Sequence, residues 1–214
     1  MKFRWLGHSA VELEDKGKKI VVDPYTDEPL EPDIICLTHG HSDHLGSTID
    51  LAKKYNPKVV AIFELASYLQ SKGIDAIGIN MGGSVTIDGI EITMVEAKHS
   101  SSVMEGEKII YAGEPCGYVI KGSRTAYHAG DTSLFSDMRL IKELYAPDIS
   151  FLPVGGFYTM DERQTLMAAE LLGSHKIVPI HYNTFDLIKT DLKLLKEKLG
   201  EKLSVPEKGK AYEI

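Results

Sequence analysis

The feature that most constrains this chain is the segment His39–His44 (HGHSDH), which comes directly after the apolar run Asp33–Leu37. A compact apolar run of this kind predicts a buried strand, so the segment stands at a strand end. His39 and His41 are two residues apart, and an extended backbone places both side chains on the same side. The pair Asp43-His44 follows where the chain turns into a helix and approaches from another direction. Imidazole and carboxylate groups in this order predict a metal site.

These ligand types suit Zn, Mn, Fe or Ni, and zinc is the metal we expect. One divalent ion cannot readily use all four groups and keep a position open for substrate, so we expect two divalent ions per chain. The later chain offers further ligand types at or just past predicted strand ends: His99 after Ile90–Ala97, Asp131 after Arg124–His128, and His181 after Lys176–Ile180. A carboxylate has two oxygens, so Asp131 is the natural bridge between two cations.

Strands come early and helices alternate with strands late, in both halves of the chain. This rhythm predicts two sheets between outer helices, in one domain spanning residues 1–214. The predicted strands are Lys2–Leu6, Ala10–Leu13, Lys19–Val22, Asp33–Leu37, Lys58–Ile62, Ala76–Ile79, Ser84–Ile87, Ile90–Ala97, Cys116–Ile120, Arg124–His128, Ile149–Pro153, Lys176–Ile180 and Lys210–Ile214. The predicted helices are Ser47–Tyr55, Glu64–Ser71, Ser136–Tyr145, Arg163–Leu172 and Leu187–Lys198.

Charge and composition exclude several classes of partner. With 24 Lys and Arg against 31 Asp and Glu, the net charge is −7, so we expect no nucleic-acid partner, because phosphate contacts need clustered cations. No apolar run approaches the roughly 18–20 residues that span a bilayer, and the N-terminus lacks a signal-peptide core. Cys36 and Cys116 stand in no CxxC or zinc-ribbon spacing and are expected to be buried free thiols, which fits a reducing compartment. We expect a cytoplasmic protein with a small-molecule substrate. The sequence leaves open whether the chain forms a homo-oligomer.

The sequence resembles the metallo-β-lactamase superfamily, whose HxHxDH box stands here as His39–His44. The later order of histidine, Gly-Asp and histidine also matches, at His99, Gly130-Asp131 and His181. A narrower likeness, to the UPF0173 metal-dependent hydrolases and the ascorbate-6-phosphate lactonase-like branch, rests on further motifs. These motifs are Trp5–Ala10 (WLGHSA), Asp23-Pro24, Tyr127–Thr132 (YHAGDT) and Pro179–Phe185 (PIHYNTF). The resemblance covers the whole chain and implies an α+β fold, a four-layer αββα sandwich with a two-metal site at one edge of the sheets.

The resemblance also implies how the ligands divide between the metals. One ion would be held by His39, His41 and His99, the other by Asp43, His44 and His181, with Asp131 bridging. Asp23 resembles the superfamily's first-motif aspartate, which would accept a hydrogen bond from a ligand histidine, although Asp-Pro is also a common turn.

His8 has two interpretations that the sequence leaves open. It faces the substrate or acts as an acid, since free imidazole titrates near neutrality, or it is a packed loop histidine. His128 is expected to support the Gly-Asp turn, and His175 to lie on the surface. Tyr182–Phe185 and Gly155–Tyr158 are candidate pocket rims.

These residues predict a binuclear metal-dependent hydrolase, with Asp43, Asp131 and His8 as its catalytic side chains. A metal-bound hydroxide would attack an ester or lactone, or a small phosphodiester. The alternatives are a metal-dependent nuclease and a catalytically silent metal-binding protein. The complete ligand set argues against the silent protein, because a structural zinc site usually stops at four closed ligands.

Overall fold

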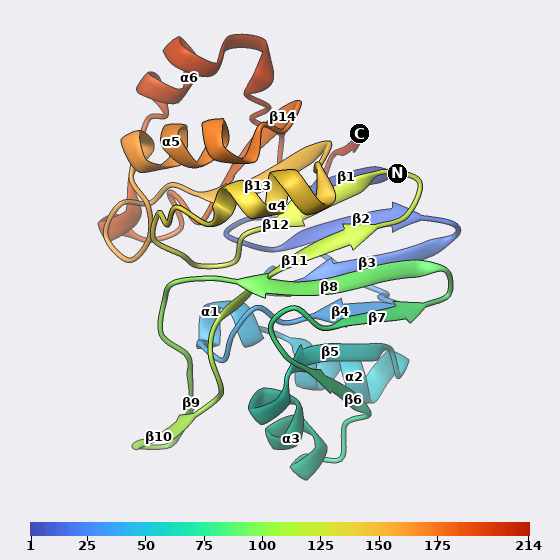
Figure 1. The fold of residues 1–214 in the computed structure, drawn as a ribbon. Coiled ribbons are helices and arrows are strands. Elements are labelled where there is room, and N and C mark those ends of the chain that lie inside the picture. Colours follow the sequence, from blue (N-terminus) through green and yellow to red (C-terminus); the bar gives the residue numbers. More distant parts are fainter.

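Two β-sheets lie face to face in the computed structural model, which describes residues 1–214 (Figure 1). The first sheet has the strand order β15 (Ala211–Glu213), β1 (Lys2–Trp5), β2 (Val11–Asp15), β3 (Lys18–Val22), β4 (Ile34–Cys36), β5 (Lys58–Ile62) and β6 (Ala76–Ile79). The second has the order β14 (Lys176–Ile180), β13 (Ile149–Pro153), β12 (Thr125–His128), β11 (Cys116–Lys121), β8 (Ile90–Glu96) and β7 (Ser84–Ile87). A separate hairpin of β9 (Ser102–Glu105) and β10 (Lys108–Tyr111) projects from the body.

Both sheets combine an antiparallel part with a parallel part. Strands β1, β2 and β3 form an antiparallel meander, and β3 through β6 pair in parallel. In the second sheet, β7, β8, β11 and β12 pair antiparallel, whereas β12, β13 and β14 pair in parallel. Parallel strands end at the same edge of a sheet, which is where open α/β sheets bind their ligands. The residues after β4, β12 and β14 are therefore brought to one side of the molecule.

Alternating side chains separate the core between the sheets from the core under the helices. In β11, Tyr118 and Ile120 belong to the main cluster of 32 buried residues, whereas Val119 between them packs in a second cluster. In β13, Phe151 faces the main cluster and Leu152 the second, as the two-residue period of a strand requires. The second cluster includes residues of two helices that follow β12 and β13, so those helices cover the outer face of the second sheet.

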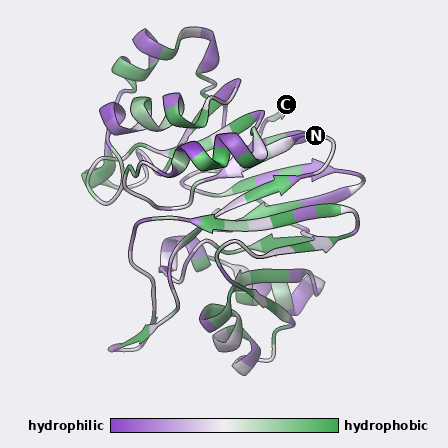
Figure 2. Cartoon of the chain, in the orientation of Figure 1, coloured by the Kyte–Doolittle hydropathy of each residue, from purple (hydrophilic) through white to green (hydrophobic).

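The helices complete the four layers. They are α1 (Ser42–Leu45), α2 (Thr48–Tyr55), α3 (Phe63–Ser71), α4 (Met138–Tyr145), α5 (Glu162–Leu172) and α6 (Lys193–Leu199), with short 3₁₀ turns at Asp186–Ile188 and Gly200–Lys202. Figure 1 shows α2 and α3 beside β5 and β6, and α4, α5 and α6 beside β12 to β14. Figure 2 shows hydrophilic and hydrophobic residues alternating along α4, whose Met138 and Ile141 are buried against the sheet. None of these helices combines the length and apolar composition that crossing a membrane requires.

The α+β architecture and the sandwich of two sheets between helices are confirmed. All the predicted strands are present, with ends that shift by at most two residues. The predicted helix Leu187–Lys198 is wrong over its first half, because Leu192 has φ +59° and α6 begins only at Lys193. The side chain of Glu162 accepts hydrogen bonds from Thr190 Oγ1 at 2.8 Å and from Leu195 N at 3.0 Å, so a contact with α5 overrides the local helical pattern. The hairpin β9–β10 and the single-turn helix α1 were not among the predicted elements.

Candidate metal centre

Three histidines form the first cluster at the sheet edge. His39 and His41 follow β4, and His99 follows β8. Their ring centroids are 4.6 Å apart for His39 and His41, and 5.3 Å from each of these to His99. His39 Nε2 lies 3.0 Å from His41 Nδ1, and one ligand atom of each of the three residues falls within 4.8 Å of the others. One cation can therefore contact all three rings.

A second cluster of potential ligands adjoins the first. It contains Asp43 and His44 from α1, His181 after β14, and His8 from the loop between β1 and β2. Asp43 Oδ2 lies 3.8 Å from His181 Nε2 and 4.0 Å from His44 Nε2. The His39 and His44 rings, whose centroids are 4.0 Å apart, connect the two clusters. The geometry thus offers two adjacent cation positions.

Asp131 lies between these positions. Its Oδ1 is 3.3 Å from His44 Nε2, and its Oδ2 is 3.1 Å from His181 Nε2 and 3.6 Å from His99 Nε2. The preceding Gly130 has φ +61°, and a Cβ there would come within 2.6 Å of the Cys116 carbonyl oxygen. Only glycine permits this turn, which carries the chain from β12 to Asp131.

A buried carboxylate, that of Asp23, fixes the orientation of two of the predicted ligand histidines. Asp23 Oδ1 accepts from Thr38 N at 2.8 Å, and Oδ2 accepts from Thr38 Oγ1 and from His44 Nδ1, each at 2.7 Å. Because the Thr38 hydroxyl donates to Asp23, it accepts from His39 Nδ1, 3.0 Å away. Nδ1 is then the donor in both rings, which leaves Nε2 as the atom of each ring that would bind a metal. The hydrogen bond that the resemblance implied for Asp23 is present.

Burial and opposite charges shift the pKa values of the cluster in two directions. Burial lowers the pKa of His39 well below its usual value, and it also lowers the pKa of His41 and His99. Burial has the same effect on His44 and His181, but the carboxylate of Asp131 outweighs it, so the pKa of His44 rises well above its usual value and that of His181 rises to about 9. Without a cation, these shifts favour neutral His39, His41 and His99 and protonated His44 and His181.

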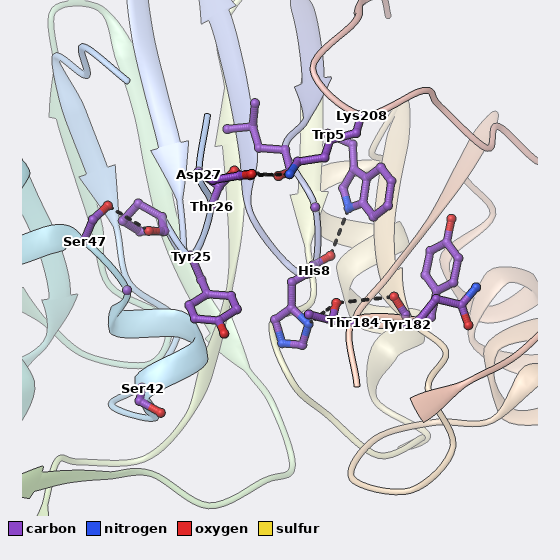
Figure 3. A pocket seen from close by; sticks show the side chains of 15 residues that line it. Trp5, His8, Tyr25, Thr26, Asp27, Ser42, Ser47, Tyr182, Thr184 and Lys208 are labelled. Atoms are coloured by element: carbon purple, nitrogen blue, oxygen red, sulfur yellow. Dashed lines mark hydrogen bonds and ion pairs between the residues drawn. The ribbon is translucent and has the colours of Figure 1, made fainter. Parts of the chain in front are cut away.

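A cavity of about 630 Å³ opens over the two clusters, a size typical of small-molecule sites. It is lined by Tyr25, His41, Ser42, Asp43, His99, Ser100, Asp131, Tyr158, His181, Phe185 and Leu187. The aromatic and aliphatic side chains among these are partly exposed, and no Lys or Arg reaches the cavity. A second cavity of about 580 Å³, which His8 lines, shares Tyr25 and Ser42 with the first (Figure 3).

The structure brings together all seven predicted ligand residues and places His8 beside them. His8 is 2% exposed and lines the second cavity, not the one over Asp43 and Asp131. His128 supports the turn before Asp131, because its Nδ1 accepts from Gly130 N at 3.1 Å, and His175 is exposed.

Of the candidate rims, Tyr158 and Phe185 line the first cavity, whereas Tyr182 to Thr184 line the second. Gly155 and Gly156 line neither. Sequence reasoning missed Thr38, whose only signal is a hydroxyl directly before the first ligand histidine.

Comparison with known proteins gives one matching family model. The model for the β-lactamase superfamily domain matches residues 2–181, which include every predicted ligand.

Relatives of similar length extend the match to nearly the whole chain. A UPF0173 metal-dependent hydrolase of Nanoarchaeum equitans is 45% identical over 94% of this chain and 93% of its own length. Another, of Methanosarcina mazei, is 41% identical over 100% of this chain and 99% of its own. Among solved structures, a metallo hydrolase of Ignicoccus hospitalis superposes with a TM-score of 0.88 at 35% identity, over 100% of this chain and 98% of its own.

Replacing Asp23 should weaken cation binding without touching a ligand. In Asp23→Asn the amide donates where the carboxylate accepts, so His44 and His39 lose their fixed orientation. We expect zinc affinity, measured by competition with a chromogenic chelator, to fall about 10–100-fold. The control is Asp75→Asn, which removes an exposed ion pair with Lys58. Affinities within twofold of each other in the two variants would refute the role of Asp23.

Loading with zinc should release protons in a pH-dependent way. The raised pKa values of His44 and His181 mean that the metal-free protein holds protons there near pH 7.5, and these must leave when a cation binds. Above about pH 9, His181 has already lost its proton, so the release should fall by up to one proton per chain. Calorimetric titration in buffers of different ionisation enthalpy measures this release. A release that stays constant from pH 7 to pH 10 would be inconsistent with the shift.

Proposed function

Because the chain belongs to the β-lactamase superfamily, as a member of its UPF0173 metal-dependent hydrolases, we propose that it is a binuclear hydrolase acting on small esters or lactones. The observation that carries the binuclear part is the position of Asp131 between two clusters of ligand atoms. Each of its two oxygens lies within 3.3 Å of an imidazole nitrogen. Zinc fits this donor set, and manganese, iron and nickel are compatible with it.

Two buried polar atoms without a hydrogen-bond partner also support cation binding. His44 Nε2 and Asp131 Oδ1 are buried, lie 3.3 Å apart, and form no hydrogen bond. Buried polar atoms in a folded protein are almost always satisfied, so such a pair needs a partner. A cation would supply that partner. His39, His41 and His99 would hold one ion, Asp43, His44 and His181 the other, and Asp131 would bridge them.

When bound, two such ions supply Lewis acidity at a substrate oxygen and lower the pKa of water to about 7. The protein supplies the remaining requirements. Asp23 and Thr38 hold two imidazoles in a single tautomer, so the ligands need no reorganisation during turnover. Tyr25, Phe185 and Leu187 form an apolar wall beside the cluster, which would bind the non-reacting part of a substrate and exclude water.

The lining of the cavity favours an uncharged substrate over a phosphodiester. Arg and Lys are the side chains that most often bind phosphate groups, because they match its charge and Arg also its geometry. Neither residue lines the cavity, whereas four aromatic or aliphatic side chains do. An ester or lactone with an apolar portion therefore suits it best. The same absence argues against nucleic acid, in agreement with the net charge of −7.

We place the protein in the cytoplasm, with a small molecule as its substrate. Its two cysteines, Cys36 and Cys116, are free and fully buried, as in proteins of reducing compartments.

Substitution of the bridging carboxylate tests the function. Asp131→Asn should lower kcat/KM by more than about 100-fold, because it removes a group shared by both cation positions. The matched control is His175→Ala, which removes an exposed histidine outside the clusters and should leave kcat/KM unchanged. Suitable substrates for the zinc-loaded protein are a nitrophenyl ester, a γ-lactone and a bis(nitrophenyl) phosphodiester.

Three results would contradict the proposal. Full turnover by Asp131→Asn with unchanged metal content would refute the role of the bridge. If the protein cleaved the phosphodiester or RNA faster than the uncharged substrates, its substrate class would be phosphodiesters and not esters or lactones. Tight metal binding without turnover of a broad ester and lactone panel would favour a silent metal-binding protein.

A further inference from the structure

The two cation positions have matching sets of three imidazoles. The first set is His39, His41 and His99, and the second is His8, His44 and His181. In the second set, the ring centroid of His8 lies 4.2 Å from that of His181 and 5.7 Å from that of His44, and the centroids of His44 and His181 are 5.8 Å apart. The corresponding separations in the first set are 4.6, 5.3 and 5.3 Å. We propose that His8 is a direct metal ligand, the third imidazole of the position that also contains Asp43. This inference rests on the proposed two-metal function.

The donor atom of His8 lies among those of the other ligands. His8 Nε2 is 3.1 Å from Asp43 Oδ2, and the donor atoms of the four residues at this position all lie within 4.8 Å of one another. Bonds from zinc to nitrogen and oxygen are about 2.0–2.2 Å long, so small side-chain rotations bring such a set onto one ion. His8 is also only 2% exposed, so its ring is buried at the edge of the second cavity.

The other ring nitrogen of His8 has the partner that a ligand histidine needs. His8 Nδ1 lies 2.9 Å from Thr184 Oγ1, as His44 Nδ1 lies 2.7 Å from Asp23 Oδ2. Histidine ligands in metalloproteins usually donate this second N–H to an oxygen, which leaves the opposite nitrogen free for the metal. Figure 3 shows the His8 ring beside Thr184, with Tyr25 on its other side.

The backbone at His8 is held in a conformation that it would not adopt by itself. His8 has φ +49°, in the left-handed region that costs non-glycine residues energy and that clusters at functional sites. Its carbonyl oxygen accepts from Trp5 Nε1 at 2.9 Å and from His181 N at 3.0 Å. Trp5 is itself fixed by stacking on Tyr182, with centroids 5.6 Å apart. One backbone contact therefore ties His8 directly to the ligand His181.

The competing role is that of a positioning residue, in which His8 stays outside the metal and only donates to Asp43. The wild-type protein distinguishes the two roles. In a crystal structure of the zinc-loaded chain we expect His8 Nε2 at about 2.0–2.1 Å from one ion. Two ions with His8 Nε2 beyond 3 Å, still bonded to Asp43, would overturn this inference and leave the proposed function intact. If neither position took up metal, the proposed function itself would fail.

Variants loaded with cobalt(II) provide a second test in solution. In His8→Ala we expect one of the two cobalt affinities to fall more than about 100-fold, with a changed visible absorption spectrum that added imidazole restores. His175→Ala, an exposed histidine, should leave both affinities and the spectrum unchanged. An unchanged spectrum in His8→Ala would overturn the proposal. If His8→Ala fails to fold, the crystal structure of the wild type decides.

Discussion

The buried carboxylate of Asp23 is the contact on which the rest of the site depends. It accepts three hydrogen bonds, orienting His44 directly and His39 through the Thr38 hydroxyl, and these two histidines belong to different clusters. Leaving a buried carboxylate unpaired would be costly, so these donors must be in place when the chain folds. The same hydrogen bonds thus join the end of β3 to the end of β4 and orient the potential ligands His39 and His44.

The two sheets bring distant segments of the chain to the edge where this site lies. The potential ligands come from the loops after β1, β4, β8, β12 and β14 and from helix α1, and the parallel strands β4, β12 and β14 end at the same edge. Several turns at this edge require left-handed backbone, including Asp23 at φ +49° and His181 at φ +52°. Such conformations persist only when surrounding contacts over-determine them. The rigidity of the sandwich therefore stabilises the strained loops that carry the chemistry.

Much of the architecture was predictable because the spacing of apolar residues along a strand or helix reflects which of its faces are buried. The HxHxDH segment identified the first ligands, and strand ends identified His99, Asp131 and His181 as members of the same edge. Local patterns could not reveal contacts between distant elements. Glu162 on α5 decides where α6 begins, which is why the helical pattern from Leu187 misled. The hairpin β9–β10 forms a sheet of its own, so no neighbouring strand or core pattern marked it.

The position of His8 shows the same limit at the site itself. Its sequence context allowed a substrate-facing, an acidic or a merely packed histidine. The ring of His8 contacts Asp43, which is 35 residues away in the sequence, and Thr184, which is 176 residues away. A local sequence pattern cannot encode such distant contacts. Such contacts follow only from the folded chain, because they depend on how the loop after β1 meets the loop after β14.

The central claim is that one chain assembles two adjacent cation positions around Asp131. Elemental analysis of untagged protein, purified without chelator and quantified per chain, tests it most directly. The account predicts close to two divalent ions per chain. A content that stays at or below one ion per chain, even after incubation with Zn, Mn, Fe and Ni, would contradict it.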